Sequence, residues 1–119
     1  MTLKGTGIVS IGELLVEFVY GGKDGHHRRA GHYSGPYPSG AAAIFIDQAA
    51  RCGGRTIFVG AVGADAFGHV LLDRFAVDGV DCSLITTVAD RPTGTAFVSY
   101  NSDGTRDFVF NIVHSAASQ

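Results

Sequence analysis

Cysteine, proline, methionine and tryptophan are scarce in this chain of 119 residues, which contains two, three, one and none of them respectively. A small secreted disulfide framework needs more than two cysteines, so Cys52 and Cys82 are expected to be reduced thiols in a cytoplasmic protein. Neither lies in a CxxC motif, and each is expected to be a small apolar filler. The first residues also lack the apolar region of a signal peptide.

Long apolar runs and an excess of one charge are missing as well. No stretch approaches the roughly 18 apolar residues of a membrane span, so no membrane association is expected. Nine basic and eleven acidic residues give a formal net charge of -2, which argues against a nucleic-acid partner. Hydrophobic residues make up 45% of the chain, which favours one packed domain over a disordered segment.

The first two-thirds of the chain has the pattern of alternating strands and helices. Apolar, β-branched runs at residues 7–12, 56–62 and 80–82 are typical of strands that are covered by other elements. Between them, residues 39–53 and 66–78 carry apolar side chains at helical spacing. This order predicts an α/β fold with a parallel sheet and right-handed crossovers.

Two polar residues stand where the predicted helices begin. Ser39 and Asp65 can each accept a hydrogen bond from a free amide of the first turn, so both are predicted to be N-caps. Residues 60–65 resemble a phosphate-binding glycine loop only loosely, because neither GxGxxG nor GxxxxGK[ST] occurs in the chain. A strand-to-helix turn capped by Asp65 is therefore the preferred interpretation.

Towards the C-terminus the pattern changes to a period of two residues. Residues 95–100 and 105–112 alternate in polarity, and the turn formers at 101–104 join them into a predicted hairpin. Residues 14–20 form a similar extended run. Together these segments are expected to form a small antiparallel ribbon that projects from the parallel sheet.

Candidate ligand-binding residues gather near the start of the first helix. The small residues around Ser39 and Gly40 would let a ligand approach the helix N-terminus, although a tight junction is the alternative. Glu17 could hold two sugar hydroxyls, although an exposed strand glutamate is the alternative. No metal site is predicted, because the histidines of the polar loop lack converging spacing; these are His26, His27 and His32.

Six short motifs, in this order and spacing, resemble the N-terminal part of a ribokinase-like (PfkB) carbohydrate kinase. They are residues 11–17 (IGELLVE), 38–43 (PSGAAA), 58–68 (FVGAVGADAFG), 78–81 (DGVD), 91–98 (RPTGTAFV) and 102–104 (SDG). The resemblance covers nearly the whole chain. It implies the N-terminal half of a doubly wound α/β sheet, with a small antiparallel β lid at about residues 14–34 and 94–112.

The resemblance also implies an activity and a set of substrate-binding residues. In such kinases the γ-phosphoryl group of ATP passes to a sugar hydroxyl in the presence of Mg²⁺, under a lid that excludes water. Glu17 falls at the family's sugar-binding aspartate, and Ser39 and Gly40 fall on its Gly-Gly pair. The lid strands that face the sugar would contribute Phe97, Phe110 and Asn111.

This sequence departs from the family pattern in two ways. Ile44 stands where the family usually has an asparagine, and Ser39 adds a side chain to the Gly-Gly pair. In addition, the family's catalytic aspartate, in a Gly-Ala-Gly-Asp segment, and its ATP-binding region have no match in residues 1–119. The resemblance therefore implies one portion of a kinase domain, with no catalytic residue of its own and no activity alone.

Two other interpretations remain open. The chain could be a non-catalytic sugar-binding or dimerisation module whose lid strands pair across a homodimer. A Rossmann nucleotide-binding domain is less consistent with residues 12–15, because the glycine fingerprint after the first strand is missing. In every case, a parallel sheet of three strands is expected to leave one edge unpaired and one apolar face uncovered.

Overall fold

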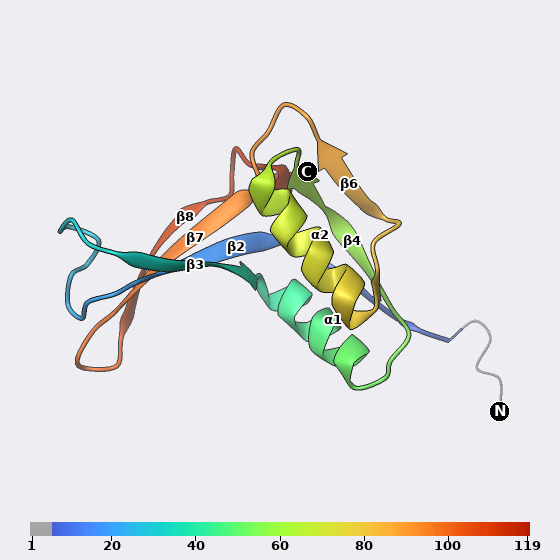
Figure 1. Cartoon of the computed structure of the whole chain (residues 1–119), viewed down its shortest axis with the longest axis horizontal. Helices are drawn as coiled ribbons and strands as arrows, with labels where there is room; N and C mark the ends of the chain where they lie inside the picture. The colour runs from blue at the N-terminus through green and yellow to red at the C-terminus, as the bar shows by residue number, and fades with distance from the viewer. Residues whose placement is uncertain (1–5) are drawn as a thin grey trace.

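The structure, a computed structural model, describes residues 6–119, which form an elongated body of 54 × 34 × 20 Å. Figure 1 shows two helices packed on parallel strands at one end and a long twisted sheet extending from the other. The elements in chain order are β1 (Ile8–Ile11), β2 (Leu15–Tyr20), β3 (Tyr33–Ser39), α1 (Ala41–Arg51), β4 (Thr56–Gly63), α2 (Ala66–Asp78), β5 (Val80–Asp81), β6 (Ile85–Val88), β7 (Gly94–Tyr100), β8 (Arg106–Asn111) and a 3₁₀ turn (Ala116–Ser118).

The predicted parallel sheet is confirmed. β1 and β5 flank β4 and both run parallel to it, so the three predicted strands form one parallel sheet in the order β1-β4-β5. β6 also pairs in parallel with the second half of β4, from Gly60 to Gly63. This fourth strand was not predicted, because residues 85–88 form too short a run for sequence periodicity to separate them from a loop.

Both helices lie together over one face of the parallel strands (Figure 1). Between the helices and this face lies a core of buried apolar side chains, which are Leu14, Val16, Ala43, Ile46, Phe58, Val62, Leu71, Phe75 and Val80. The predicted cap of α2 is confirmed, since Asp65 accepts from the amide of Gly68 and Gly79 ends the helix in the left-handed conformation.

The opposite face of the parallel strands is uncovered at β1, as the sequence predicts, whereas the C-terminal 3₁₀ turn packs against β4. On β1, Ser10 is buried and its hydroxyl donates to the carbonyl of Ala42 in α1 at 3.0 Å. Its neighbours Val9 and Ile11 point to the other side and are 58% and 73% exposed. An apolar strand face therefore meets solvent.

The lid is a mixed four-stranded sheet in the order β3-β2-β7-β8. The β7–β8 hairpin is antiparallel as predicted, but β2 and β7 at the centre of the sheet are parallel. An antiparallel arrangement throughout is thus wrong: β2 leaves the body and β7 re-enters the lid in the same direction, because the whole βα body lies between them in the chain.

One outer strand of the lid was not anticipated. β3 carries Pro36 and Pro38, which normally argue against a strand. These prolines are tolerated because β3 is an edge strand that pairs only with β2 in the described sheet. The first lid segment therefore continues to Ser39, beyond the expected limit near residue 34.

None of the helices within residues 6–119 is long and apolar enough to cross a membrane. Both cysteines are free. Cys82 is partly buried, which raises the pKa of its thiol, but Cys52 is exposed at the end of α1 and is not the apolar filler that was expected.

Candidate functional site

The lid sheet has two distinct faces, and Glu17 lies on the face that points away from the helices. Pairing places Glu17 of β2 beside Ala96 of β7, which in turn lies opposite Phe110 of β8. Because neighbouring residues in register project to the same side, these three side chains form one row across the sheet. Phe110 is 56% exposed, so the row is open to a ligand.

Ser39 and Gly40 lie at the base of the same face. Ser39 pairs with Leu15, two residues before Glu17, and therefore shares its side of the sheet. Gly40 follows at once and is the N-cap residue of α1. The structure thus brings four of the six predicted binding residues to one region: Glu17, Ser39, Gly40 and Phe110.

Ser39 does not cap α1, contrary to the sequence prediction. It is the last residue of β3, and no side chain makes a cap hydrogen bond at this helix. Gly40 makes the turn instead, with φ of 105°. A Cβ atom at this position would lie 2.3 Å from the carbonyl oxygen of Glu13, so only glycine lets the two backbone segments approach.

Phe97 and Asn111 lie on the opposite face of the lid, away from Glu17. The Phe97 ring stacks on Phe18 with centroids 5.1 Å apart, and Phe18 in turn contacts Phe67 of α2 edge-on at 5.4 Å. The amide nitrogen of Asn111 donates to the hydroxyl of Thr95 at 3.2 Å. Phe97 therefore reaches the helical part only through Phe18, Asn111 bonds within the lid, and neither belongs to the row that contains Glu17.

The residues of the Glu17 face that sequence reasoning missed are small. Ala96 and Val98 of β7 are buried and lie beside Glu17 and Val19. Alternation within residues 94–100 shows that Ala96 and Val98 lie on one face of β7 and Phe97 on the other. Which of these faces carries Glu17 depends on the pairing of β7 with β2. No signal within the hairpin itself could supply that pairing.

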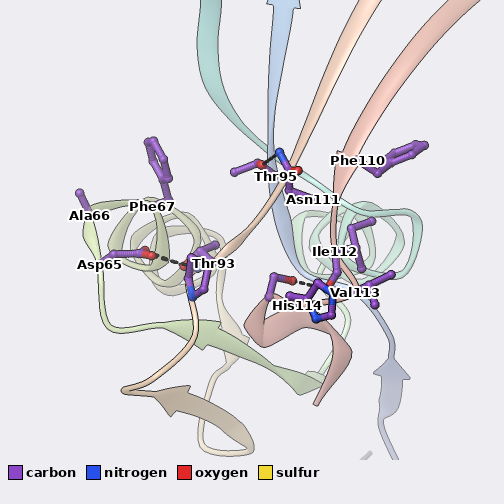
Figure 2. Close-up of a pocket in the computed structure, with 12 residues that line it drawn as sticks. Asp65, Ala66, Phe67, Thr93, Thr95, Phe110, Asn111, Ile112, Val113 and His114 are labelled. Carbon is purple, nitrogen blue, oxygen red and sulfur yellow. Dashed lines mark hydrogen bonds between the residues drawn. The ribbon is translucent and has the colours of Figure 1, made fainter.

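A cavity of about 650 Å³ opens at the β8 edge of the lid, between the start of α2 and the end of β8, and Phe110 of the Glu17 row is among the residues that line it. Figure 2 shows Asp65, Thr93 and Phe67 on one side of it and Phe110 and His114 on the other, with Thr95 and Asn111 between them. Its volume is in the range of small-molecule sites. However, four of its polar side chains are already bonded in two pairs, Thr93 to Asp65 and Asn111 to Thr95.

Asp65 and Thr93 form a clasp between the start of α2 and the segment that enters β7. The hydroxyl of Thr93 donates to Oδ1 of Asp65 at 2.6 Å, and its amide donates to Oδ2 at 2.9 Å. The same hydroxyl oxygen accepts from the amide of Gly63 at 2.9 Å. Burial opposes ionisation of Asp65, but the bonds from Thr93 and from the amides of Gly68 and Phe67 outweigh it and lower the pKa.

No group of three acidic, histidine or cysteine side chains within residues 6–119 is placed to hold a metal ion. Instead, two histidines of the polar loop contact other parts of the lid. His26 Nδ1 lies 2.6 Å from Oδ2 of Asp107, and His27 Nδ1 lies 2.8 Å from the hydroxyl of Tyr33. The loop is therefore attached to the sheet.

Comparison with known proteins shows the family to which the chain is related. The sequence profile described as pfkB family carbohydrate kinase matches residues 6–119. Fructokinase-2 of Solanum habrochaites is 37% identical over 103 residues, which are 87% of this chain and 31% of the relative. The chain therefore spans about a third of the length of the relatives that it matches.

Solved structures show the same relationship. A protein from E. coli provisionally named ribokinase II superposes in its apo form with a TM-score of 0.92 and 42% identity, covering 95% of this chain and 36% of that one. In its complex with ATP and Mg²⁺ the TM-score is 0.90. Fructokinase from Xylella fastidiosa gives 0.80 at 32% identity, with 92% and 33% coverage. The chain belongs to the pfkB family of carbohydrate kinases.

Proposed function

We propose that residues 6–119 form the sugar-binding and lid portion of an ATP-dependent carbohydrate kinase. The observation that carries this proposal is the open row of Glu17, Ala96 and Phe110, with Ser39 and Gly40 at its base. Membership of a carbohydrate kinase family supports a sugar as the ligand. Because the curated relatives are named fructokinases, fructose is the first sugar to test.

The proposed chemistry of the site follows from its residue types. The Glu17 carboxylate would accept hydrogen bonds from two adjacent sugar hydroxyls. The ring of Phe110 would cover an apolar face of the sugar and keep water away from it. Gly40 leaves the amides at the start of α1 open to a hydroxyl oxygen.

ATP and Mg²⁺ are expected for the complete kinase, but the described residues do not fit them. The described part of the chain contains no cluster of carboxylates for a metal, and Asp65 is already committed to Thr93 and the first turn of α2. We therefore place the general base and the nucleotide site outside these residues. No step of phosphoryl transfer is assigned to a residue of this chain.

The binding proposal is tested by titrating the 119-residue protein with fructose and following amide chemical shifts. We expect shifts at Glu17, Gly40 and Phe110, and at least about tenfold weaker binding for Glu17→Gln and Phe110→Ala. Val109→Ala is the matched control, because Val109 is exposed on the opposite face of β8. Equal losses in the variants and the control would contradict the proposed face.

The activity proposal is tested separately. With ATP, Mg²⁺ and fructose, the 119-residue protein is expected to show no phosphoryl transfer, because no residue in it is assigned as the base. Turnover should appear when the remaining part of a homologous kinase is supplied. Fructose-dependent ADP formation by residues 1–119 alone would refute the proposal that the general base and the nucleotide site lie outside these residues.

A homodimer formed through the lid is a further proposal, and it is favoured by the exposed aromatic pair of Phe108 and Phe110. Their rings stack at 5.1 Å on the outer strand, and both remain partly exposed. Sedimentation is expected to show a dimer that Phe108→Ser weakens. A monomer at all concentrations would exclude the homodimer.

We also propose a cytoplasmic location, which fractionation of cells would test.

A further inference from the structure

The loop between β2 and β3 packs closely against the lid. Three of its glycines surround the ring of Tyr20, the last residue of β2. A Cβ atom at Gly22, Gly25 or Gly31 would lie 2.9, 2.6 or 2.8 Å from that ring. The loop therefore wraps the aromatic ring closely, and a side chain added at any of the three glycines would require the ring to move.

The same loop is bonded to the tip of the β7–β8 hairpin. The amide of Asp24 donates to the carbonyl of Tyr100 at 3.0 Å. In return, the Asp24 carboxylate accepts from the amide of Ser102 at 2.9 Å and from its hydroxyl. These bonds lower the pKa of Asp24. They join segments 78 residues apart in the chain.

His27 connects the two outer strands of the four-stranded lid. Its Nδ1 lies 2.8 Å from the hydroxyl of Tyr33 in β3, and its Nε2 lies 3.1 Å from the carbonyl oxygen of Asp107 in β8. Its ring also stacks on Tyr33, with centroids 5.8 Å apart and an interplanar angle of 5°. One side chain thus bridges β3 and β8, which lie at opposite edges of the sheet.

These contacts determine which nitrogen of neutral His27 carries the proton. The Asp107 carbonyl can only accept, so Nε2 must donate to it. Nδ1 is then unprotonated and accepts from the Tyr33 hydroxyl. The neighbouring His26 adds a second contact to β8, with Nδ1 at 2.6 Å from the Asp107 carboxylate.

We propose that residues 21–32 are a strap that holds the four lid strands together as one rigid unit, with His27 as its bridge. The strap lies on the side of the sheet that carries Tyr20 and Tyr33, opposite the face that carries Glu17. It therefore fixes the shape of that sheet without occupying the Glu17 face. Its relevance to sugar binding rests on the proposed function, whereas its existence as a strap does not.

Hydrogen exchange of the 119-residue protein tests the strap without any ligand. The reporter amides are those of Gly21, Asp24 and Ser102, which donate to His32, Tyr100 and Asp24. In His27→Asn they are expected to exchange about tenfold faster, since two hydrogen bonds and a ring contact are lost. Asparagine is chosen because it tolerates the positive φ of 58° at this position.

His32→Asn is the matched control, because His32 belongs to the same loop and its side chain is exposed. This variant is expected to leave the three reporter amides unchanged. Unchanged exchange in His27→Asn, or equal acceleration in both variants, would overturn the proposal. If His27→Asn does not fold, Tyr33→Phe removes only the hydroxyl partner and is expected to accelerate the same amides to a smaller extent.

Nitrogen-15 spectra of labelled histidine give an independent test. We expect neutral His27 to carry its proton on Nε2, with an unprotonated Nδ1. A proton on Nδ1 in the neutral ring would leave a bare nitrogen facing the Asp107 carbonyl, and would contradict the bridge. Neither measurement involves sugar, so a failure of the strap is distinguishable from a failure of the proposed function.

Discussion

At the scale of single residues, the most heavily bonded carboxylate of the described chain is Asp65. It caps α2 and also accepts both the amide and the hydroxyl of Thr93. Thr93 itself is only 2% exposed, so removing the carboxylate would leave buried donors without a partner. The clasp therefore combines a local helix cap with a contact between segments 28 residues apart.

Asp65→Ala is expected to lower the free energy of unfolding at pH 7 by about 2 kcal/mol, because a cap and the bonds to Thr93 are lost together. The folded pKa of Asp65 is lower than the ordinary 3.8, so its stabilisation is present above 3.8 and is lost as the pH falls through the folded value. Urea unfolding should show that the difference in unfolding free energy between the original protein and Asp65→Ala is smaller below pH 3.8 than at pH 7. Asp81→Ala, which removes an exposed turn carboxylate, should have a much smaller effect.

A second carboxylate has the opposite effect on stability. Burial, and then the nearby Asp78 carboxyl group, raise the pKa of Asp47. One oxygen of each side chain is buried without a hydrogen-bond partner, namely Oδ1 of Asp47 and Oδ2 of Asp78. A proton shared between the two groups would satisfy both oxygens, so the ionised pair is unfavourable at neutral pH.

Asp47→Asn is therefore expected to stabilise the protein at pH 7 by about 1 kcal/mol, because the amide can donate to Asp78. The raised folded pKa means that the native contact is strongest below 3.8 and weakens as the pH rises through the folded value. The gain from the substitution should accordingly vanish near pH 3. Asp73→Asn on the exposed side of α2 is the control, and an equal gain there would indicate a general charge effect.

At the scale of elements, the junction between β3 and α1 depends on one glycine. Gly40 has φ of 105°, and its α-carbon lies against the Glu13 carbonyl. This approach sets the start of α1 next to the base of the lid. The helix has no side-chain cap, so the backbone path at Gly40 is what defines its first turn.

Gly40→Ala is expected to cost about 3 kcal/mol or more of unfolding free energy, because backbone strain and a steric clash add together. Gly53→Ala is the matched control. Its φ is also positive, at 92°, but nothing lies within 4 Å of the added methyl group. It should cost about 1 kcal/mol. Equal losses in thermal or urea unfolding would show that the contact with Glu13 does not matter.

At the scale of the whole molecule, β1 exposes apolar side chains on the side of the parallel sheet that the helices do not cover. Val9 and Ile11 project from it while Ser10 faces α1. Such a face favours association with other apolar surfaces. The adjacent helices cannot cover it, because both lie on the other side of the strands (Figure 1).

Replacing Val9 and Ile11 together by threonine is expected to reduce the binding of an apolar dye and any self-association, with little loss of stability. Threonine keeps the β-branched shape that suits a strand. Dye fluorescence and sedimentation would measure the change. Val77→Thr is the control, because Val77 is 84% exposed on α2, away from this face. An unchanged dye signal in the double variant would count against the face as an association surface.

The sequence by itself determined the elements that depend on neighbouring residues. Asp65 and Gly79 mark the ends of α2 through contacts within one helical turn, and alternation in residues 94–111 marks the hairpin. The buried parallel strands also follow from their composition. Family motifs then led to Glu17, Ser39, Gly40 and Phe110, whose grouping depends on strand register.

Only the tertiary structure decided the features that depend on distant pairing. Alternation separates two sets of side chains on β7, but the parallel pairing with β2 determined that Phe97 faces Phe18 and that Ala96 faces Glu17. An edge position let β3 accept prolines that local rules exclude. The bonds of His27 to both edge strands likewise arise from segments far apart in the chain, and local patterns contain no information about such contacts.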